Sequence, residues 1–228
     1  MKKTLLGALV VVTAAFFSIA CQAAAKADIV FDVAVDVANE SEVLTAGITH
    51  AAVNAAEATQ ANVTLNGVVF QSGNVNDATN ITTTGFTSNN AANLNPNGLG
   101  DTAEYQRFLG DIDFGGGGGD ITIQNLTVGN AYALQIWFVD DRTGGFGGRV
   151  TTITSGANSV DLNDQFAIGN FVADTDSLTF TVATLGADPN LTGFQVRDLG
   201  VVAVPEPSSL VVLGMGISGL FLRRRRSA

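Results

Sequence analysis

Apolar and polar residues alternate with a period of two through most of the chain between Asp28 and Val204. Such a period places successive side chains on opposite faces of a β-sheet. The longest run is Ala131–Val139. One face of this predicted strand carries Tyr132, Leu134, Ile136 and Phe138, and the other carries Gln135 and Trp137.

Shorter alternating runs predict further strands along the same region. They are Ile29–Val37, Ile121–Gln124, Arg149–Thr154, Gln165–Val172, Leu178–Val182 and Phe194–Val202. Asn66-Gly67 divides the β-rich segment Asn62–Gln71, and Asn-Gly between two such runs predicts a tight hairpin. A turn is expected at Val128-Gly129-Asn130, just before the longest strand.

Signals for helices are few by comparison. Ala51–Ala58 has a helical composition, and Asp101–Glu104 could cap a short helix that runs through Leu109. Many short strands together with 26 glycines favour an all-β fold. We therefore predict one domain over residues 28–203, a sandwich of two antiparallel sheets, between two terminal segments of different character.

The first 27 residues have the layout of a secretory signal peptide. Lys2 and Lys3 precede an uncharged apolar run, and small residues lead to a cleavage position after Ala27. This layout predicts an apolar signal helix over residues 1–27 that signal peptidase removes. Cys21 leaves lipidation as the alternative. In either case the folded body has no cysteine, so neither disulfides nor thiol catalysis operate there.

Charge is distributed very unevenly. The segment 28–204 holds four arginines, no lysine and 20 acidic residues, a net charge of −16, while the other basic residues lie in the terminal segments. Such a field repels nucleic acid and anionic lipid, because no counter-charges are available to them. We expect contact with a membrane only through the terminal segments.

The C-terminal segment 204–228 combines three features in a fixed order. Pro205, Glu206 and Pro207 come first, and the two prolines exclude a regular element there. An apolar run follows at 210–222, which as a helix would be about 20 Å long against a hydrocarbon core of about 30 Å. The chain then carries a basic cluster, Arg223, Arg224, Arg225 and Arg226, expected on the cytoplasmic side.

This order of features resembles the PEP-CTERM sorting tail of bacterial surface proteins. The resemblance implies recognition by a membrane enzyme, exosortase, cleavage near Pro-Glu-Pro, and release of the body to the cell surface or the extracellular matrix. Until cleavage the short helix would anchor the protein transiently in the inner membrane. An ordinary single-pass anchor is the alternative interpretation of the same segment.

The body is also similar to an uncharacterised extracellular module of planctomycete-type surface proteins. The similarity lies in the Asn66-Gly67 turn, YQRFLG, LTVGNAYALQIWFVDDR, GNFVADTDSLTF and the closing FQVRDL. It implies a jelly-roll sandwich like that of galactose-binding and carbohydrate-binding modules. It implies no activity.

Catalytic signals are sparse. His50 is the only histidine, so a multi-histidine metal site is excluded and a Ser-His-Asp triad would depend on it alone. No G-x-S-x-G nucleophile elbow occurs. Pairs of carboxylates exist, but their separation is not readable from the sequence. We therefore predict a protein that is not an enzyme and that needs no cofactor.

Calcium is a possible structural ligand, because it accepts carboxylate and carbonyl oxygens. Asp174 and Asp176 provide one closely spaced oxygen set, and Asp111-Ile112-Asp113 provides another. Neither fits an EF-hand loop. Solvated loop charge is the alternative for both sets.

A polar group surrounds the end of the longest predicted strand: Trp137, Asp140, Asp141, Arg142 and Arg149. One hypothesis is a sugar platform, in which Trp137 stacks on a sugar ring and the carboxylates bind its hydroxyls. The alternative is ion pairing of the arginines with the acidic residues, with Trp137 packed under a loop or against the second sheet.

These observations favour an exported surface or matrix protein that binds or embeds in extracellular polysaccharide. A structural protein without a specific ligand is the close alternative, and an enzyme acting on matrix glycans is the third hypothesis. The expected partners are signal peptidase, an exosortase-type enzyme and exopolysaccharide.

Overall fold

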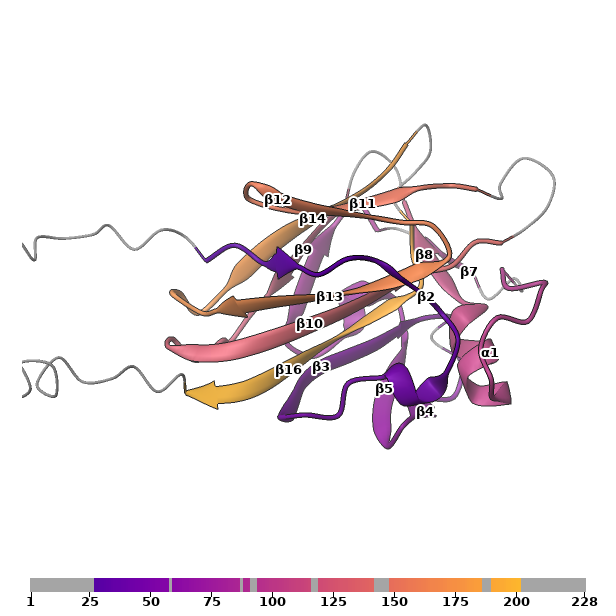
Figure 1. The fold of residues 1–228 in the computed structure, drawn as a ribbon, viewed down its shortest axis with the longest axis horizontal. Coiled ribbons are helices and arrows are strands. Elements are labelled where there is room, and N and C mark those ends of the chain that lie inside the picture. The colour runs from indigo at the N-terminus through magenta and orange to yellow at the C-terminus, as the bar shows by residue number, and fades with distance from the viewer. Residues whose placement is uncertain are drawn as a thin grey trace, which may run out of the picture.

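The computed structural model describes residues 27–57, 59–86, 88–90, 94–115, 119–141, 148–185 and 190–201. In this part of the chain two β-sheets pack face to face (Figure 1). The predicted all-β sandwich is therefore confirmed in outline. The finer jelly-roll and galactose-binding-like topology stays a prediction.

The larger sheet has eight strands. Along its main path the order is β1 (Val30–Phe31), β13 (Gln165–Val172), β10 (Asn130–Phe138), β16 (Gly193–Val201), β3 (Ile48–Ala55), β5 (Val68–Gly73) and β4 (Val63–Leu65), and β2 (Val35–Asp36) also pairs with β13. Neighbouring strands are antiparallel except β3 and β5, which are parallel. The prediction of purely antiparallel sheets is wrong for that pair.

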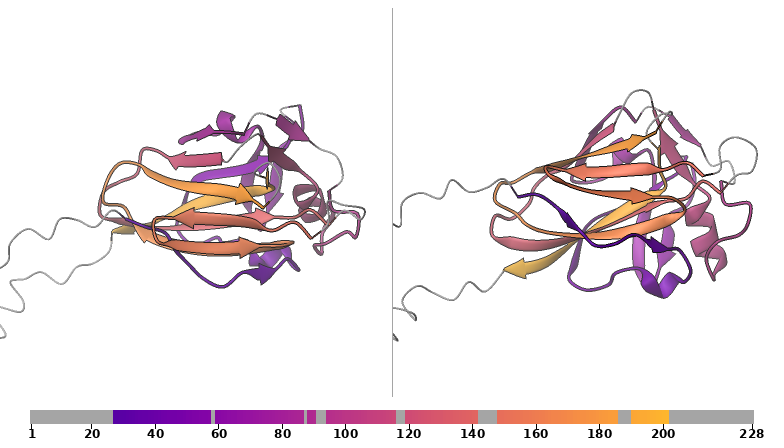
Figure 2. Two further views of the ribbon diagram at one scale, coloured as in Figure 1. Left: turned by 90° about the horizontal axis from the view of Figure 1, so that it is seen from above. Right: turned by 45° about the horizontal axis from the view of Figure 1, so that its top comes forward.

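The second layer is a five-stranded antiparallel sheet, in which most neighbouring strands are not consecutive in the sequence. It consists of β12 (Asn158–Leu162), β11 (Thr151–Ser155), β14 (Leu178–Thr184), β9 (Gly119–Ile123) and β6 (Ile81–Thr84). Figure 2 shows the two layers from further sides.

A small third sheet and a few helical turns complete the described part of the chain. The sheet has the order β15 (Asn190–Leu191), β8 (Ile112–Phe114) and β7 (Ser88–Asn90). The sequence predicted two sheets, so this third one was not expected. The helix α1 spans Ala103–Leu109, and 3-10 turns lie at η1 (Glu40–Glu42) and η2 (Val75–Asp77). The hydroxyl of Thr102 caps α1 by accepting the backbone N–H of Tyr105, so the predicted short helix is confirmed.

Local sequence signals succeed at one turn and fail at one strand. Asn66 and Gly67 both have positive φ, 46° and 78°, as a type I′ hairpin turn requires, and they join β4 to β5. By contrast, Ala51–Ala58 has a helical composition, but most of this segment forms the second half of β3. Pairing with β16 on one side and β5 on the other overrides the local preference for helix.

The main core lies between the two large sheets. Every apolar side chain predicted on one face of β10, from Tyr132 to Phe138, belongs to it. The five-stranded sheet contributes Ile121, Phe180 and Ile153 from its inner face, all at most 1% exposed. The alternating pattern of the sequence therefore fixes the inner faces of both sheets correctly.

A second apolar cluster covers the outer face of the eight-stranded sheet. Its members come from β10, β13, β3, α1, the β4–β5 hairpin and the segment around η1: Val37, Val43, Ala52, Val63, Leu65, Val68, Phe70, Tyr105, Phe108, Leu109, Trp137, Val139 and Phe166. This sheet is thus buried on both faces along much of β10, where the last seven residues are all buried.

Polar side chains on the same outer face hold a loop across it. Gln135 accepts the N–H of Leu44 and donates to the carbonyl oxygen of Glu42, at 2.9 Å each. Arg197 is 5% exposed and donates to the carbonyl oxygens of residues 45, 46 and 47. The guanidinium thus binds backbone rather than a carboxylate, and burial lowers its pKa.

Both ends of the described body lie at one end of the sandwich. The start of the described chain, just before β1, and the end of β16 lie on the same side in Figure 1, and α1 lies at the opposite end. The predicted signal helix, Cys21, the helix at 210–222 and the tail residues fall outside the described residues. Within the described residues, no helix has the length and apolar character needed to cross a membrane.

Candidate functional site

Trp137 is an interior residue with no exposed face. Its exposed fraction is 0%, and its indole N–H donates to the Tyr105 hydroxyl at 3.0 Å. The rings of Phe70 and Phe108 meet it edge-on at centroid distances of 5.8 and 5.2 Å. The predicted stacking platform for sugar at Trp137 is therefore wrong, because Phe108 of α1 and Phe70, from β5 at the far end of the same sheet, cover this face of β10.

The acidic residues beside Trp137 support the loops around them. Asp140 is 1% exposed, and its carboxylate lies 3.6 Å from the guanidinium of Arg149. Asp141 accepts the backbone N–H of Asn97 at 3.1 Å. The ion-pairing alternative thus describes Asp140 and Arg149, whereas Arg142 lies outside the described residues.

The predicted calcium ligands Asp174 and Asp176 lie in the turn between β13 and β14. Asp174 is half-buried and accepts the backbone N–H of Ala27 at 2.8 Å, while Asp176 is exposed. Among the described residues, no three His, Cys, Asp or Glu side chains gather in a way that could hold a metal ion. Calcium at this turn stays a prediction.

His50 lies on β3 and is partly buried. Its Nε2 is 2.8 Å from the carbonyl oxygen of Gln124, and its ring meets Tyr132 edge-on. These contacts describe a histidine that ties β3 to the segment after β9.

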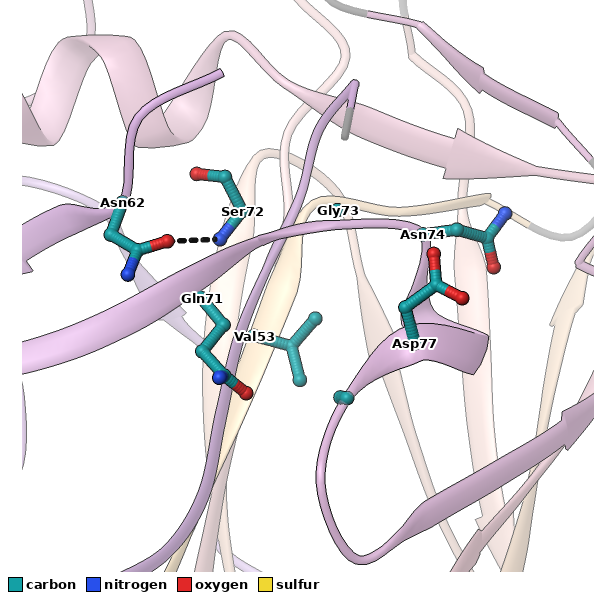
Figure 3. A pocket seen from close by; sticks show the side chains of 8 residues that line it. Val53, Asn62, Gln71, Ser72, Gly73, Asn74 and Asp77 are labelled. Atoms are coloured by element: carbon teal, nitrogen blue, oxygen red, sulfur yellow. Dashed lines mark hydrogen bonds between the residues drawn. The ribbon is translucent and has the colours of Figure 1, made fainter. Parts of the chain in front are cut away.

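A small polar pocket lies where β5 ends and η2 begins (Figure 3). Its volume is about 130 Å³, and its lining is Val53, Asn62, Gln71, Ser72, Gly73, Asn74, Asp77 and Ala78. Asn62 closes one side, since its side-chain oxygen accepts the N–H of Ser72 at 3.2 Å. We call this feature the β5 pocket.

Buried polar side chains adjoin the β5 pocket. Asn54, at the end of β3, is 0% exposed and donates to the Ser72 hydroxyl at 3.2 Å and to the Asp111 carboxylate at 2.8 Å. Its own oxygen Oδ1 has no hydrogen-bond partner. Burial raises the pKa of Asp111, and the hydrogen bond from Asn54 partly opposes that rise.

Asp113 lies two residues further along, in β8, and is fully buried. Its carboxylate accepts the backbone N–H of Val75 at 2.9 Å, which fixes the start of η2. Burial raises the pKa of Asp113 to about 6. Asp111 and Asp113 were predicted as a possible set of calcium ligands in a loop. Both are buried, and they accept hydrogen bonds from Asn54 and Val75, close to the pocket.

Hydrogen-bonding chemistry dominates the pocket. Amides and a hydroxyl supply donors and acceptors, Asp77 supplies one carboxylate, and no lysine or arginine is among the described residues that line it. Sequence patterns did not point to Asn54, Asn62, Gln71, Ser72 and Asn74. Their only signal was polarity at strand ends, and the pocket depends on the parallel pairing of β3 with β5.

The residues that follow β16 match a known sorting motif. Residues 203–226 match the family model described as the PEP-CTERM protein-sorting motif. The chain carries a PEP-CTERM protein-sorting motif. This confirms the resemblance stated for the tail from Val204 to Ala228, of which the match covers all but the last two residues. No curated protein and no solved structure matches the chain.

The PEP-CTERM motif supports an exported protein that exosortase processes and sorts to the cell surface. It begins two residues after the end of β16 at Val201. The motif residues Pro205, Glu206, Pro207, Arg223, Arg224, Arg225 and Arg226 lie outside the described part of the structure. The PEP-CTERM motif thus indicates a destination and a processing enzyme. It gives no information about a ligand of the body.

Proposed function

We propose that this PEP-CTERM protein is a non-enzymatic component of the cell surface or extracellular matrix, and that its sandwich binds or embeds in extracellular polysaccharide. The observation that carries the proposal is the sorting motif at residues 203–226. A protein delivered to a polysaccharide-rich surface works among hydroxyl-bearing polymers, and a strongly acidic body stays soluble there.

The β5 pocket supports sugar binding of a limited kind. Its amides and hydroxyl can exchange hydrogen bonds with sugar hydroxyls, and it offers no cation to attract an anionic group. With a volume of about 130 Å³ it is smaller than typical small-molecule pockets, which measure roughly 300 Å³ or more. It therefore suits a single sugar unit rather than a length of polymer.

Two observations support a role without catalysis. His50 is engaged with the Gln124 carbonyl oxygen rather than with a serine or an acid. The buried carboxylates of Asp111 and Asp113 accept hydrogen bonds that hold β3 and η2 in place. These contacts support a structural role for both carboxylates.

A structural matrix protein without a specific ligand is the second candidate. The burial of Trp137 favours it, because the chain has one tryptophan and that ring is not available for stacking on sugar. Glycan binding separates the two candidates. Protein recovered from outside the producing cells should bind polysaccharide on a glycan array, and Gln71→Ala should weaken any binding in the pocket.

Processing by exosortase is tested independently of the ligand. Mass spectrometry of the released protein should show a C-terminus near Pro205 to Pro207. Intact Arg223 to Arg226 in the released form would contradict processing. Replacing Pro205 and Pro207 by alanine should leave the uncleaved chain in the cell fraction. The matched control replaces Ser208 and Ser209 by alanine and should be processed normally.

A further inference from the structure

The outer face of the five-stranded sheet carries rows of registered side chains, most of which end in a hydroxyl group. The registered side chains form three rows across the strands: Thr82, Thr122 and Thr179; then Thr84, Asp120, Thr181, Thr154 and Ser159; then Ala183, Thr152 and Asp161. All of them are exposed or partly exposed. We call this surface the threonine face.

Sheet geometry gives the threonine face its repeat. Neighbouring strands lie about 4.8 Å apart, and side chains two residues apart on one strand are about 6.7 Å apart. Hydrogen bonds fix several of its members: Thr122 and Thr179 share one at 2.8 Å, Thr181 donates to Asp120, and Thr152 donates to Asp161. Branched side chains with restrained χ1 keep the array ordered.

The inner face of the same strands is apolar, so the hydroxyls are fixed on the outside. Ile121 and Ile123 in β9, Phe180 in β14 and Ile153 in β11 are at most 1% exposed. A change of register by one residue would bury the threonines and expose this core. The threonine face is therefore a stable, outward-facing property of the fold.

The chemistry of the face limits what can bind there. Among the residues that the structure describes, no lysine or arginine belongs to the rows, and the two charged members are Asp120 and Asp161. Both are exposed carboxylates. They repel uronic-acid or sulfated polymers, whereas a carboxylate accepts strong hydrogen bonds from neutral sugar hydroxyls. Threonine hydroxyls can both donate to and accept from the same partner.

We infer that the threonine face docks an extended, uncharged glycan with free vicinal hydroxyls. The inference rests on the proposed function, in which the exported body contacts extracellular polysaccharide, and it names the surface and the class of polymer. The glycan lies along the rows, so that successive sugar units meet successive strands. A row of five side chains, from Thr84 to Ser159, offers the longest track.

The test uses processed protein recovered from outside the producing cells and a glycan array that carries neutral β-linked oligosaccharides and their uronic-acid counterparts. The test variant combines Thr84→Val, Thr181→Val and Thr154→Val, which remove three hydroxyls of one row and keep the branched shape. Thr64→Val, on an exposed strand position of the other sheet, is the matched control. Gln71→Ala reports on the β5 pocket.

The expected result is binding to neutral extended glycans that the triple variant weakens roughly tenfold or more, since three hydrogen bonds are lost. Thr64→Val should leave affinity unchanged, and moderate salt should have little effect. Undiminished binding by the triple variant would overturn the threonine face while leaving the proposed function intact. Preference for uronic-acid glycans would overturn the charge argument. No binding by the unaltered protein to any glycan, or to the polysaccharide of the producing cells, would overturn both proposals.

Discussion

The two large sheets of the sandwich are built from similar alternating strands but differ in what covers their outer faces. The outer face of the eight-stranded sheet around β10 is covered by α1, by the loop after η1 and by side chains of the sheet's own β4–β5 end, so its outer side chains there are interior. The five-stranded sheet leaves its outer face open and fills it with threonine. Alternation therefore marks the two faces of a strand, and only the tertiary fold decides which faces meet water.

The largest expected difference between the two sheets concerns Trp137. Trp137→Ala should lower the free energy of unfolding by about 3–5 kcal/mol, because it empties a fully buried site and leaves the Tyr105 hydroxyl unpaired. Thr181→Ala, on the open face, should cost less than about 1 kcal/mol. Chemical denaturation of both variants measures the contrast. Similar losses at the two positions would contradict the assignment of covered and open faces.

A smaller effect is expected at Arg197, which holds the loop over the covered face. Arg197→Met should cost about 3 kcal/mol, because three part-buried hydrogen bonds from a charged donor to the carbonyl oxygens of residues 45–47 are lost. Arg197→Lys keeps the charge but lacks the planar fork, so it should also destabilise the body. Limited proteolysis should detect opening of this loop in both variants. Full stability of Arg197→Lys would show that charge alone is sufficient.

The smallest effect depends on pH and contrasts a buried carboxylate with the exposed ones on the threonine face. Burial raises the pKa of Asp113 to about 6, against about 4 for an unfolded aspartate. A raised native pKa means that the contribution of this group to stability is complete below about pH 4 and is lost as pH rises through about 6.

Asp113→Asn should therefore stabilise the body by roughly 2 kcal/mol at pH 7.5, and the gain should vanish by about pH 4. The amide oxygen can still accept the N–H of Val75. Asp120→Asn, on the exposed threonine face, is the matched control for removing one negative charge. Denaturation curves between pH 4 and 8 measure both. A constant gain at all pH values would point to a cause other than ionisation.

Sequence patterns predicted the inner core well because one apolar face per strand has a direct signature. The residues of β10 that face the five-stranded sheet follow it, as do the hairpin at Asn66-Gly67 and the cap at Thr102. The strand at Ala51–Ala55 was missed, since small residues carry no period and its neighbours in the sheet are distant in sequence.

The candidate site was harder to predict for a related reason. Trp137 and Gln135 alternate with apolar residues, as outward-facing residues do. The residues that cover them are distant in sequence: 42 and 44 contact Gln135, and Phe70 and Phe108 contact Trp137. The β5 pocket likewise depends on the parallel approach of β5 to β3. The threonine rows were visible as T-x-T spacing within single strands, but their registration across five strands needed the structure.

The position of β16 in its sheet gives export a definite order. β16 lies between β10 and β3 in the middle of the eight-stranded sheet, and it is the last strand before the sorting motif. β3 has no antiparallel partner until β16 arrives about 140 residues later, so pairing of this kind is slow to form. The sheet can close only after its final strand has crossed the membrane. The exported body therefore completes its larger sheet only when the strand next to the sorting motif is in place.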